Sequence, residues 1–159
     1  MFKAAFSVAA LVTAGAALAL SSQLPVQAST QAARPRVAIW EIYYNSPGSD
    51  TGSNASLNHE WVQLHNTTSK SVTMTRWTLR DTAGHVFTFG SFTLKAHAYV
   101  KIHTGHGAAT QANRYYNHSW YIWNNTGDTA TLKTAGGTTE ARCRYSDSHE
   151  RHVLTRCGR

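Results

Sequence analysis

Short alternating runs of apolar and polar residues dominate the chain from residue 37 onward. They are rich in Val, Ile, Thr, Trp, Tyr and Phe, and Gly, Asn, Asp and Ser interrupt them. A period of two residues is typical of a half-buried β-strand, and no stretch after residue 28 shows a sustained helical period. About nine strands are predicted, at 37–44, 60–65, 71–74, 77–81, 85–89, 99–103, 121–123, 129–133 and 139–145. The pattern predicts an all-β fold, an antiparallel β-sandwich.

The run from Glu60 to His65 shows how the two faces of a strand are assigned. Trp61 lies on one face with Gln63 and His65, and Val62 and Leu64 lie on the other. Trp61 and Trp77 both fall in strand patterns, and a tryptophan buries a large apolar area. We therefore expect both tryptophans to fill the core of the sandwich.

The N-terminal segment, residues 1–28, has the layout of a secretory signal peptide. Lys3 precedes an apolar run from Ala4 to Leu20, and a short polar stretch follows that ends in Val26-Gln27-Ala28, with small or apolar residues at the two positions a signal peptidase reads. A membrane anchor is the alternative, because ~17 apolar residues are at the short limit of a spanning helix. The small residues and the cleavage site favour removal near Ala28. We expect a secreted, soluble protein in which residues 29–36 form a flexible leader.

Two cysteines, Cys143 and Cys157, remain after this cleavage. An exported protein meets oxidising conditions, so a disulfide between them is the expected state. It would close a short loop and add on the order of 3 kcal/mol to stability. The alternative, a metal-binding or nucleophilic thiol, lacks a partner pattern nearby.

Positive charge gathers near the C-terminus of a chain whose net charge is +7. Between residues 142 and 159 there are five arginines, among them Arg142, Arg144, Arg151 and Arg156, against two acids. Such clustering favours contact with anionic partners: cell-wall polymer, nucleic acid or another anionic surface such as lipid headgroups. The alternative is a charge that only keeps a secreted domain soluble.

The strand pieces, taken in order and spacing, resemble the lamin-tail domain family in its bacterial secreted type. The segments that carry the resemblance are 39–48, 59–66, 72–81, 84–89, 94–107, 123–132 and the glycines at 136–137. Residues 37–145 are accordingly identified as a lamin-tail-like sandwich. The family often has a Pro-Gly turn where this chain reads Lys95-Ala96-His97-Ala98. The basic tail, residues 146–159, lies outside the family pattern.

The resemblance implies an immunoglobulin-like antiparallel β-sandwich that serves as a binding or interaction module. The family brings no catalytic residue set, so no catalytic residue and no cofactor is predicted. Glu60 and Asp81 are the acids at strand ends, and we expect them to accept N–H bonds from turns or to pair with neighbouring arginines.

Metal chemistry is weakly indicated. The loop Asn45–Asn54 is rich in oxygen ligands and offers a Ca²⁺ site, but it has one carboxylate and lacks EF-hand spacing, so a solvated loop is the main interpretation. His149 and His152 are three residues apart, whereas a zinc-protease helix needs four. These two histidines, like His103 and His106, are interpreted as surface residues, and no metal is predicted.

An aromatic and polar segment, residues 113–121, stands apart from the strand patterns. Its candidate contact residues are Arg114, Tyr115, Tyr116 and Trp120. Such a mixture can stack on sugar rings or bases, with the arginine adding a charge contact. The alternative is a loop that packs back over the end of the sandwich.

The function predicted from the sequence is a secreted, non-catalytic module that attaches to an extracellular anionic polymer, either cell wall or nucleic acid. The basic tail would supply charge, and the aromatic segment would supply contact. Two alternatives remain: a glycan-binding module that works by aromatic stacking, and a small secreted hydrolase that uses loop acids or histidines.

Overall fold

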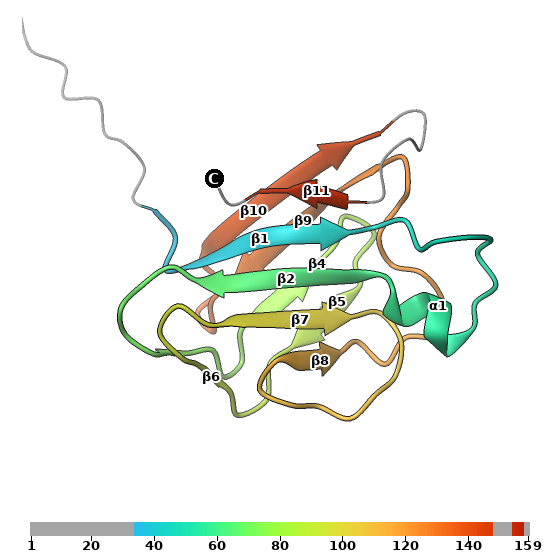
Figure 1. Cartoon of the computed structure of the whole chain (residues 1–159). Helices are drawn as coiled ribbons and strands as arrows, with labels where there is room; N and C mark the ends of the chain where they lie inside the picture. Colours follow the sequence, from blue (N-terminus) through green and yellow to red (C-terminus); the bar gives the residue numbers. More distant parts are fainter. Residues whose placement is uncertain (1–33, 148–153, 158–159) are drawn as a thin grey trace, which may run out of the picture. The chain divides into compact units, whose positions relative to one another are not determined.

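Two β-sheets make up most of the fold in the computed structural model, which describes residues 34–147 and 154–157 (Figure 1). The five-stranded sheet has the order β11-β1-β2-β7-β8, and the four-stranded sheet has the order β10-β9-β4-β5. The strands of the first are β1 Val37–Tyr43, β2 Trp61–Asn66, β7 Tyr99–His103, β8 Asn113–Tyr115 and β11 Leu154–Arg156. Those of the second are β4 Thr78–Arg80, β5 Val86–Thr88, β9 Gly127–Lys133 and β10 Thr139–Ser146. A separate pair consists of β3 Val72–Thr73 and β6 Thr93–Leu94, and one short helix, α1, spans Asn54–Asn58.

The predicted all-β, immunoglobulin-like antiparallel sandwich is confirmed, with five local differences. Eleven strands lie in the described residues, where about nine were expected. β8 lies in the segment expected to be a loop and pairs in parallel with β7. β11 lies in the tail, and β6 lies where no strand was expected. The loop 46–58 contains the helix α1. Ser53 caps the N-terminus of this helix, and its side chain accepts a hydrogen bond from the Ser56 N–H. Residues 121–123, expected as a strand, are irregular.

The core lies between the two sheets, and the pleat decides which side chains enter it. On β2 the buried apolar residues are Val62 and Leu64, and on the facing sheet Leu79 pairs with Leu132. All four side chains are fully buried, and each contributes roughly 2 kcal/mol of hydrophobic stabilisation. The core positions therefore follow the predicted period of two.

One of the two tryptophans expected in the core is not there. Trp77 is buried, but Trp61 lies on the outward face of β2, with the Lys101 ammonium 3.7 Å from the centre of its ring. The reason is the strand's parity: a side chain at an odd position of β2 cannot reach the face that holds Val62 and Leu64. The position in the pleat outweighed the size of the ring.

The side chain of Asn66, at the end of β2, ties together three segments of backbone. Its Nδ2 donates to the carbonyls of Lys70, Leu94 and Lys95 at 2.8, 3.1 and 2.9 Å. Its Oδ1 accepts from the N–H and the hydroxyl of Thr68 at 3.0 and 2.8 Å. Asn66 is fully buried, so these bonds replace every contact the amide would have made with water.

The expected disulfide between Cys143 and Cys157 is present, with 5.7 Å between the two Cα atoms. It joins β10 of one sheet to the residue after β11 of the other. Next to it, the Cys157 N–H donates to the Trp40 carbonyl at 2.9 Å. The bridge therefore fastens the last described strand to both layers.

The N-terminal predictions fall largely outside the described residues. The signal peptide, residues 1–28, and most of the leader, residues 29–36, are among the residues for which no structure is described. Arg36 does contact the sandwich: its backbone N–H donates to Glu140 Oε1 at 2.7 Å, and its guanidinium lies 3.3 Å from Oε2. No helix within the described residues is long and apolar enough to cross a membrane.

Candidate functional site

The outward side of the four-stranded sheet carries a group of cationic side chains. On β10, Cys143 and Tyr145 point into the core, so Arg142 and Arg144 point outward and are exposed. The alternation of buried and exposed residues along β10 produces this arrangement, which places the two arginines about 6.6 Å apart along the strand.

Strand register brings two more cations to the same side. Thr131 of β9 pairs with Arg142 on one side and with Arg80 of β4 on the other. Lys133, two residues after Thr131, is also outward and pairs with Thr78. Adjacent strands are about 4.8 Å apart, so four cations cover three neighbouring strands. We call this surface the basic face; its residues are Arg80, Lys133, Arg142 and Arg144.

The acids of this sheet have partners elsewhere. Within the described strands β4, β5, β9 and β10 the acids are Asp128 and Glu140. Glu140 accepts from Arg36 and from the Val37 N–H, both near β1. Asp128 is buried and accepts from the backbone of Thr82 and Thr129. The basic face therefore keeps its positive charge.

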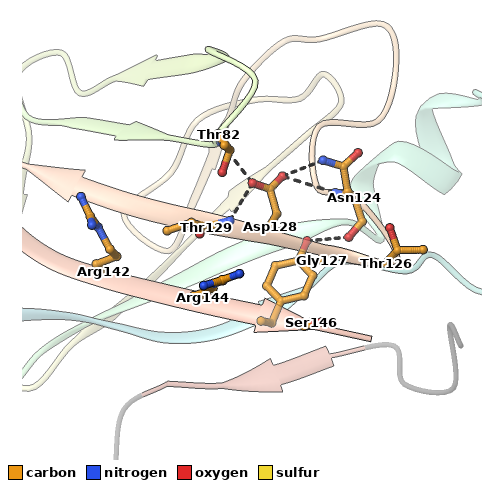
Figure 2. Close-up of a pocket in the computed structure, with 10 residues that line it drawn as sticks. Thr82, Asn124, Thr126, Gly127, Asp128, Thr129, Arg142, Arg144 and Ser146 are labelled. Atoms are coloured by element: carbon orange, nitrogen blue, oxygen red, sulfur yellow. Dashed lines mark hydrogen bonds between the residues drawn. The ribbon is translucent and has the colours of Figure 1, made fainter. Parts of the chain in front are cut away.

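A pocket of ~630 Å³ opens at one end of the basic face (Figure 2). Arg142 and Arg144 line it together with Thr129 and Ser146. Asp128 lies at its edge, where Asn124 donates to Oδ2 from its side chain at 3.1 Å (Figure 2). A pocket with two arginines, hydroxyls and an acid already occupied by hydrogen bonds suits an anionic group.

The structure separates the arginines that the sequence grouped together. Arg142 and Arg144 are neighbours on β10, but Arg156 lies on β11 in the other sheet and forms an ion pair with Glu41 at 3.2 Å. Arg151 lies outside the described residues. Arg114 lies on β8, 4.3 Å from the centre of the Phe92 ring, and burial lowers the pKa of its guanidinium.

Arg114 is also held by its own loop. Its guanidinium donates to the carbonyls of Thr110 and Asn113, so it supports the turn that precedes β8. Two members of the basic face, Arg80 and Lys133, were not among the predicted site residues. Each stands alone in its strand, and the pairing register that gathers them cannot be read from local sequence.

The aromatic candidates have different roles. Tyr116 packs against Phe87 and Trp123, and its hydroxyl donates to the Leu79 carbonyl at 3.0 Å. Burial raises the pKa of this phenol well above its usual value. Tyr115 stacks on His103 with ring centres 5.2 Å apart. Both tyrosines thus pack on the sandwich.

Trp120 has a different environment from the two tyrosines. It is exposed, with 58% of its surface accessible. Among the aromatic candidates of residues 113–121, it is therefore the ring most open to a ligand.

Glu60 and Asp81 are both engaged as acceptors, as predicted. Asp81 accepts from the N–H groups of Gly84 and His85 at 2.8 and 2.7 Å, which closes the turn between β4 and β5. Glu60 is fully buried; its Oε1 accepts from the Thr104 hydroxyl at 2.6 Å and the Ile122 N–H at 2.8 Å. Burial raises the pKa of Glu60 to about 7.

The loop 45–54 and the histidines are arranged as follows. Asp50, the carboxylate of that loop, is exposed. His103 contacts the Asn58 carbonyl at 2.8 Å and the Asn113 side chain at 2.9 Å. His149 and His152 lie outside the described residues. Within residues 34–147 and 154–157, no group of three His, Cys, Asp or Glu is placed to hold a metal ion.

A model of the Lamin Tail Domain family matches residues 30–147. The chain belongs to the lamin tail domain family. The match confirms the family resemblance, and it includes all the strands that form the basic face. It indicates an immunoglobulin-like interaction module from a non-enzymatic domain family. No curated protein matched the chain. β11 and Cys157, which complete the five-stranded sheet and the disulfide of this lamin tail domain, lie beyond the matched region.

Proposed function

We propose that this lamin tail domain is a secreted module that attaches to an extracellular anionic polymer through its basic face. The observation that carries the proposal is the set of four outward cations, Arg80, Lys133, Arg142 and Arg144, on three adjacent strands. The N-terminal sequence and the disulfide support an extracellular location, because disulfides persist in oxidising compartments.

The surroundings of these cations favour recognition of charge and not of bases or sugar rings. The outward positions next to them are mainly threonines, namely Thr78, Thr129 and Thr131, together with Thr88 on β5. No outward aromatic ring lies on these described strands to stack on a base. The basic face would therefore contact the repeating charges of a polymer backbone, such as phosphodiesters, whether in a wall polymer or in nucleic acid.

Salt should weaken this attachment steeply. For about four phosphate contacts, binding to duplex DNA is expected to fall by about a hundredfold between 50 and 200 mM salt. The double substitution Arg142→Ala, Arg144→Ala removes two contacts, so the fall should shrink to about tenfold over the same range. Binding would be measured by fluorescence anisotropy with labelled duplex DNA, and by sedimentation with isolated cell-wall material before and after removal of its phosphate polymers.

The control removes the same charge from another place. Lys70, between β2 and β3, and Lys95, between β6 and β7, are exposed and lie outside the strands of the basic face; their carbonyls accept from Asn66. The variant Lys70→Ala, Lys95→Ala should keep the salt dependence of the native protein. Equal losses in both double variants would mean that net charge alone matters, and no binding to DNA or wall material would overturn the proposal. If the protein sediments with intact wall material but not with wall material whose phosphate polymers have been removed, the phosphate polymer of the wall is the partner.

A further inference from the structure

A second pocket, of ~370 Å³, adjoins the pocket at the end of the basic face and shares Asn124 and Thr126 with it. It is lined by Asp50, Trp120, Tyr121, Ile122, Trp123, Asn124, Asn125 and Thr126, and we call it the Trp120 pocket. Its lining contains no lysine or arginine, and its charged member is the exposed carboxylate of Asp50. Its chemistry is therefore opposite to that of the basic face, and it calls for a different ligand.

The Trp120 ring is held in place on one side and open on the other. A Cβ added to Gly52 would lie 2.6 Å from Cζ3 of the Trp120 ring, so the ring rests directly on the Gly52 backbone. Gly52 has φ +67°, a conformation that L side chains rarely adopt. With that support, Trp120 still exposes 58% of its surface. The Gly52 backbone thus supports one part of the indole and leaves the rest open to solvent.

Tyr121 forms a second wall of the pocket. Its ring is 5.5 Å from the Trp120 ring at an interplanar angle of 74°. Its hydroxyl is 2.5 Å from the hydroxyl of Ser56 in α1, which fixes the ring against the helix. The two rings therefore make a corner, with one indole surface available for stacking and one tyrosine edge beside it.

Polar side chains complete the site. Asp50, Asn125 and Thr126 provide a carboxylate, an amide and a hydroxyl around the corner of rings. A flat apolar surface next to several hydrogen-bonding groups matches a sugar ring, which has apolar C–H faces and a rim of hydroxyls. The carboxylate of Asp50 opposes an anionic ligand.

Other ring-rich surfaces of the sandwich lack such an open ring. On the five-stranded sheet, Tyr43 stacks on Trp61 and His65 stacks on Tyr99, with centres 5.5 and 4.2 Å apart. In each cross-strand pair the two rings cover one another's faces, and the Lys101 ammonium also covers the Trp61 ring. The Trp120 pocket is distinguished by an indole surface that no neighbouring ring stacks on.

From this geometry we propose that the Trp120 pocket binds a neutral pyranose unit of a glycan, by stacking on Trp120 and hydrogen bonding to Asp50 and Asn125. The site adjoins the basic face but contains none of its four cations. Attachment would then involve two chemistries on one domain, one sensitive to salt and one insensitive to it.

The test titrates the whole protein with three neutral probes: an N-acetylglucosamine tetramer, cellotetraose and maltotetraose. Calorimetry should detect binding of at least one, changing less than about twofold between 50 and 200 mM salt, because no ion pair is involved. Trp120→Ala should weaken it by about tenfold, and Trp120→Phe should restore part of the loss. Tyr99→Ala, which removes another exposed ring, should bind as the native protein does.

Two further variants separate this proposal from its rivals. Arg142→Ala, Arg144→Ala should keep sugar binding, which makes failure here distinguishable from failure of the polyanion proposal. Asp50→Asn keeps the hydrogen-bonding shape but removes the charge, so a sugar should still bind. An aromatic site for an amine would instead bind choline and lose it in Asp50→Asn. Choline binding without sugar binding, or no binding to any of the three sugars, would overturn the proposal.

Discussion

Replacing Glu60 with glutamine is expected to remove a loss of stability that the native protein undergoes as pH rises. The pKa of the folded carboxyl is about 7, raised from 4.5 mainly by burial. A raised folded pKa means that the unfolded chain releases this proton first. Stability contributed by Glu60 is therefore complete below about pH 4.5 and is lost as pH rises through 7. The loss amounts to about 3 kcal/mol above that range.

The position of Glu60 explains why its charge is costly. Its hydrogen bonds from Thr104 and from the Ile122 and Trp123 backbone stabilise the ionised form, but they do not offset burial. Asp50, the nearby carboxylate, raises the pKa further. Glutamine keeps the oxygen that accepts from Thr104 and Ile122, and it carries no charge at any pH.

Urea unfolding from pH 4 to pH 8 checks this expectation. The free energy of unfolding of Glu60→Gln, minus that of the native protein, should increase by about 3 kcal/mol over that range. Taking the difference removes contributions shared by both proteins, such as His65, whose lowered pKa favours unfolding at acid pH. Asp50→Asn should reduce the native pH dependence in part. Parallel curves for native protein and Glu60→Gln would show that the carboxyl is not buried as described.

Replacing Asn66 with alanine should lower the free energy of unfolding by about 4 kcal/mol. The substitution removes five hydrogen bonds at once and leaves three carbonyl groups of the 70 and 94–95 segments without their donor. Because Asn66 is fully buried, water does not readily replace the amide. The loss should therefore exceed that of an ordinary exposed asparagine several times over.

Asn66→Asp is the sharper version of the same experiment. It preserves the size and shape of the side chain but turns a carboxylate oxygen toward the carbonyls of Lys70, Leu94 and Lys95. We expect it to be at least as damaging as alanine at pH 7 and to recover in part as pH falls and the carboxylate is protonated. Asn45→Ala, in the loop after β1, serves as the control. An Asn66→Asp protein as stable as the native one would show that the amide is not the common donor.

The sequence predicted the parts of the fold that depend on local alternation. The period of two in residues 60–65 correctly assigned Val62 and Leu64 to one face. The same reasoning placed Trp61 on the opposite face, yet its size led to the wrong expectation that it fills the core. The residue type indicated only that a tryptophan is often buried, whereas its odd or even position along the strand determined which face of the sheet it occupies.

The candidate sites depended on contacts that local sequence does not contain. Arg80 joins Arg142 through the register of two strand pairs, with Thr131 between them. Glu60 meets Ile122 at a separation of 62 residues. Tyr115 lies in a run without strand alternation, but β7 supplies a parallel edge with which it pairs. The composition of residues 113–121 identified Trp120 as a contact candidate, but it could not show that Gly52 supports the ring.

The pairing of β1 with β11 also affects the order in which the chain can fold. Glu41 pairs with Arg156, so the outer edge of β1 is covered only once β11, more than a hundred residues later, has paired with it. Contacts between distant parts of a chain form slowly, because the entropy of closing a long loop is lost before the contacts stabilise the fold. An open strand edge is a template for the strand of another molecule. A chain clipped before Leu154 would therefore expose the outer edge of β1 as an acceptor, and we expect it to self-associate more readily than the intact protein.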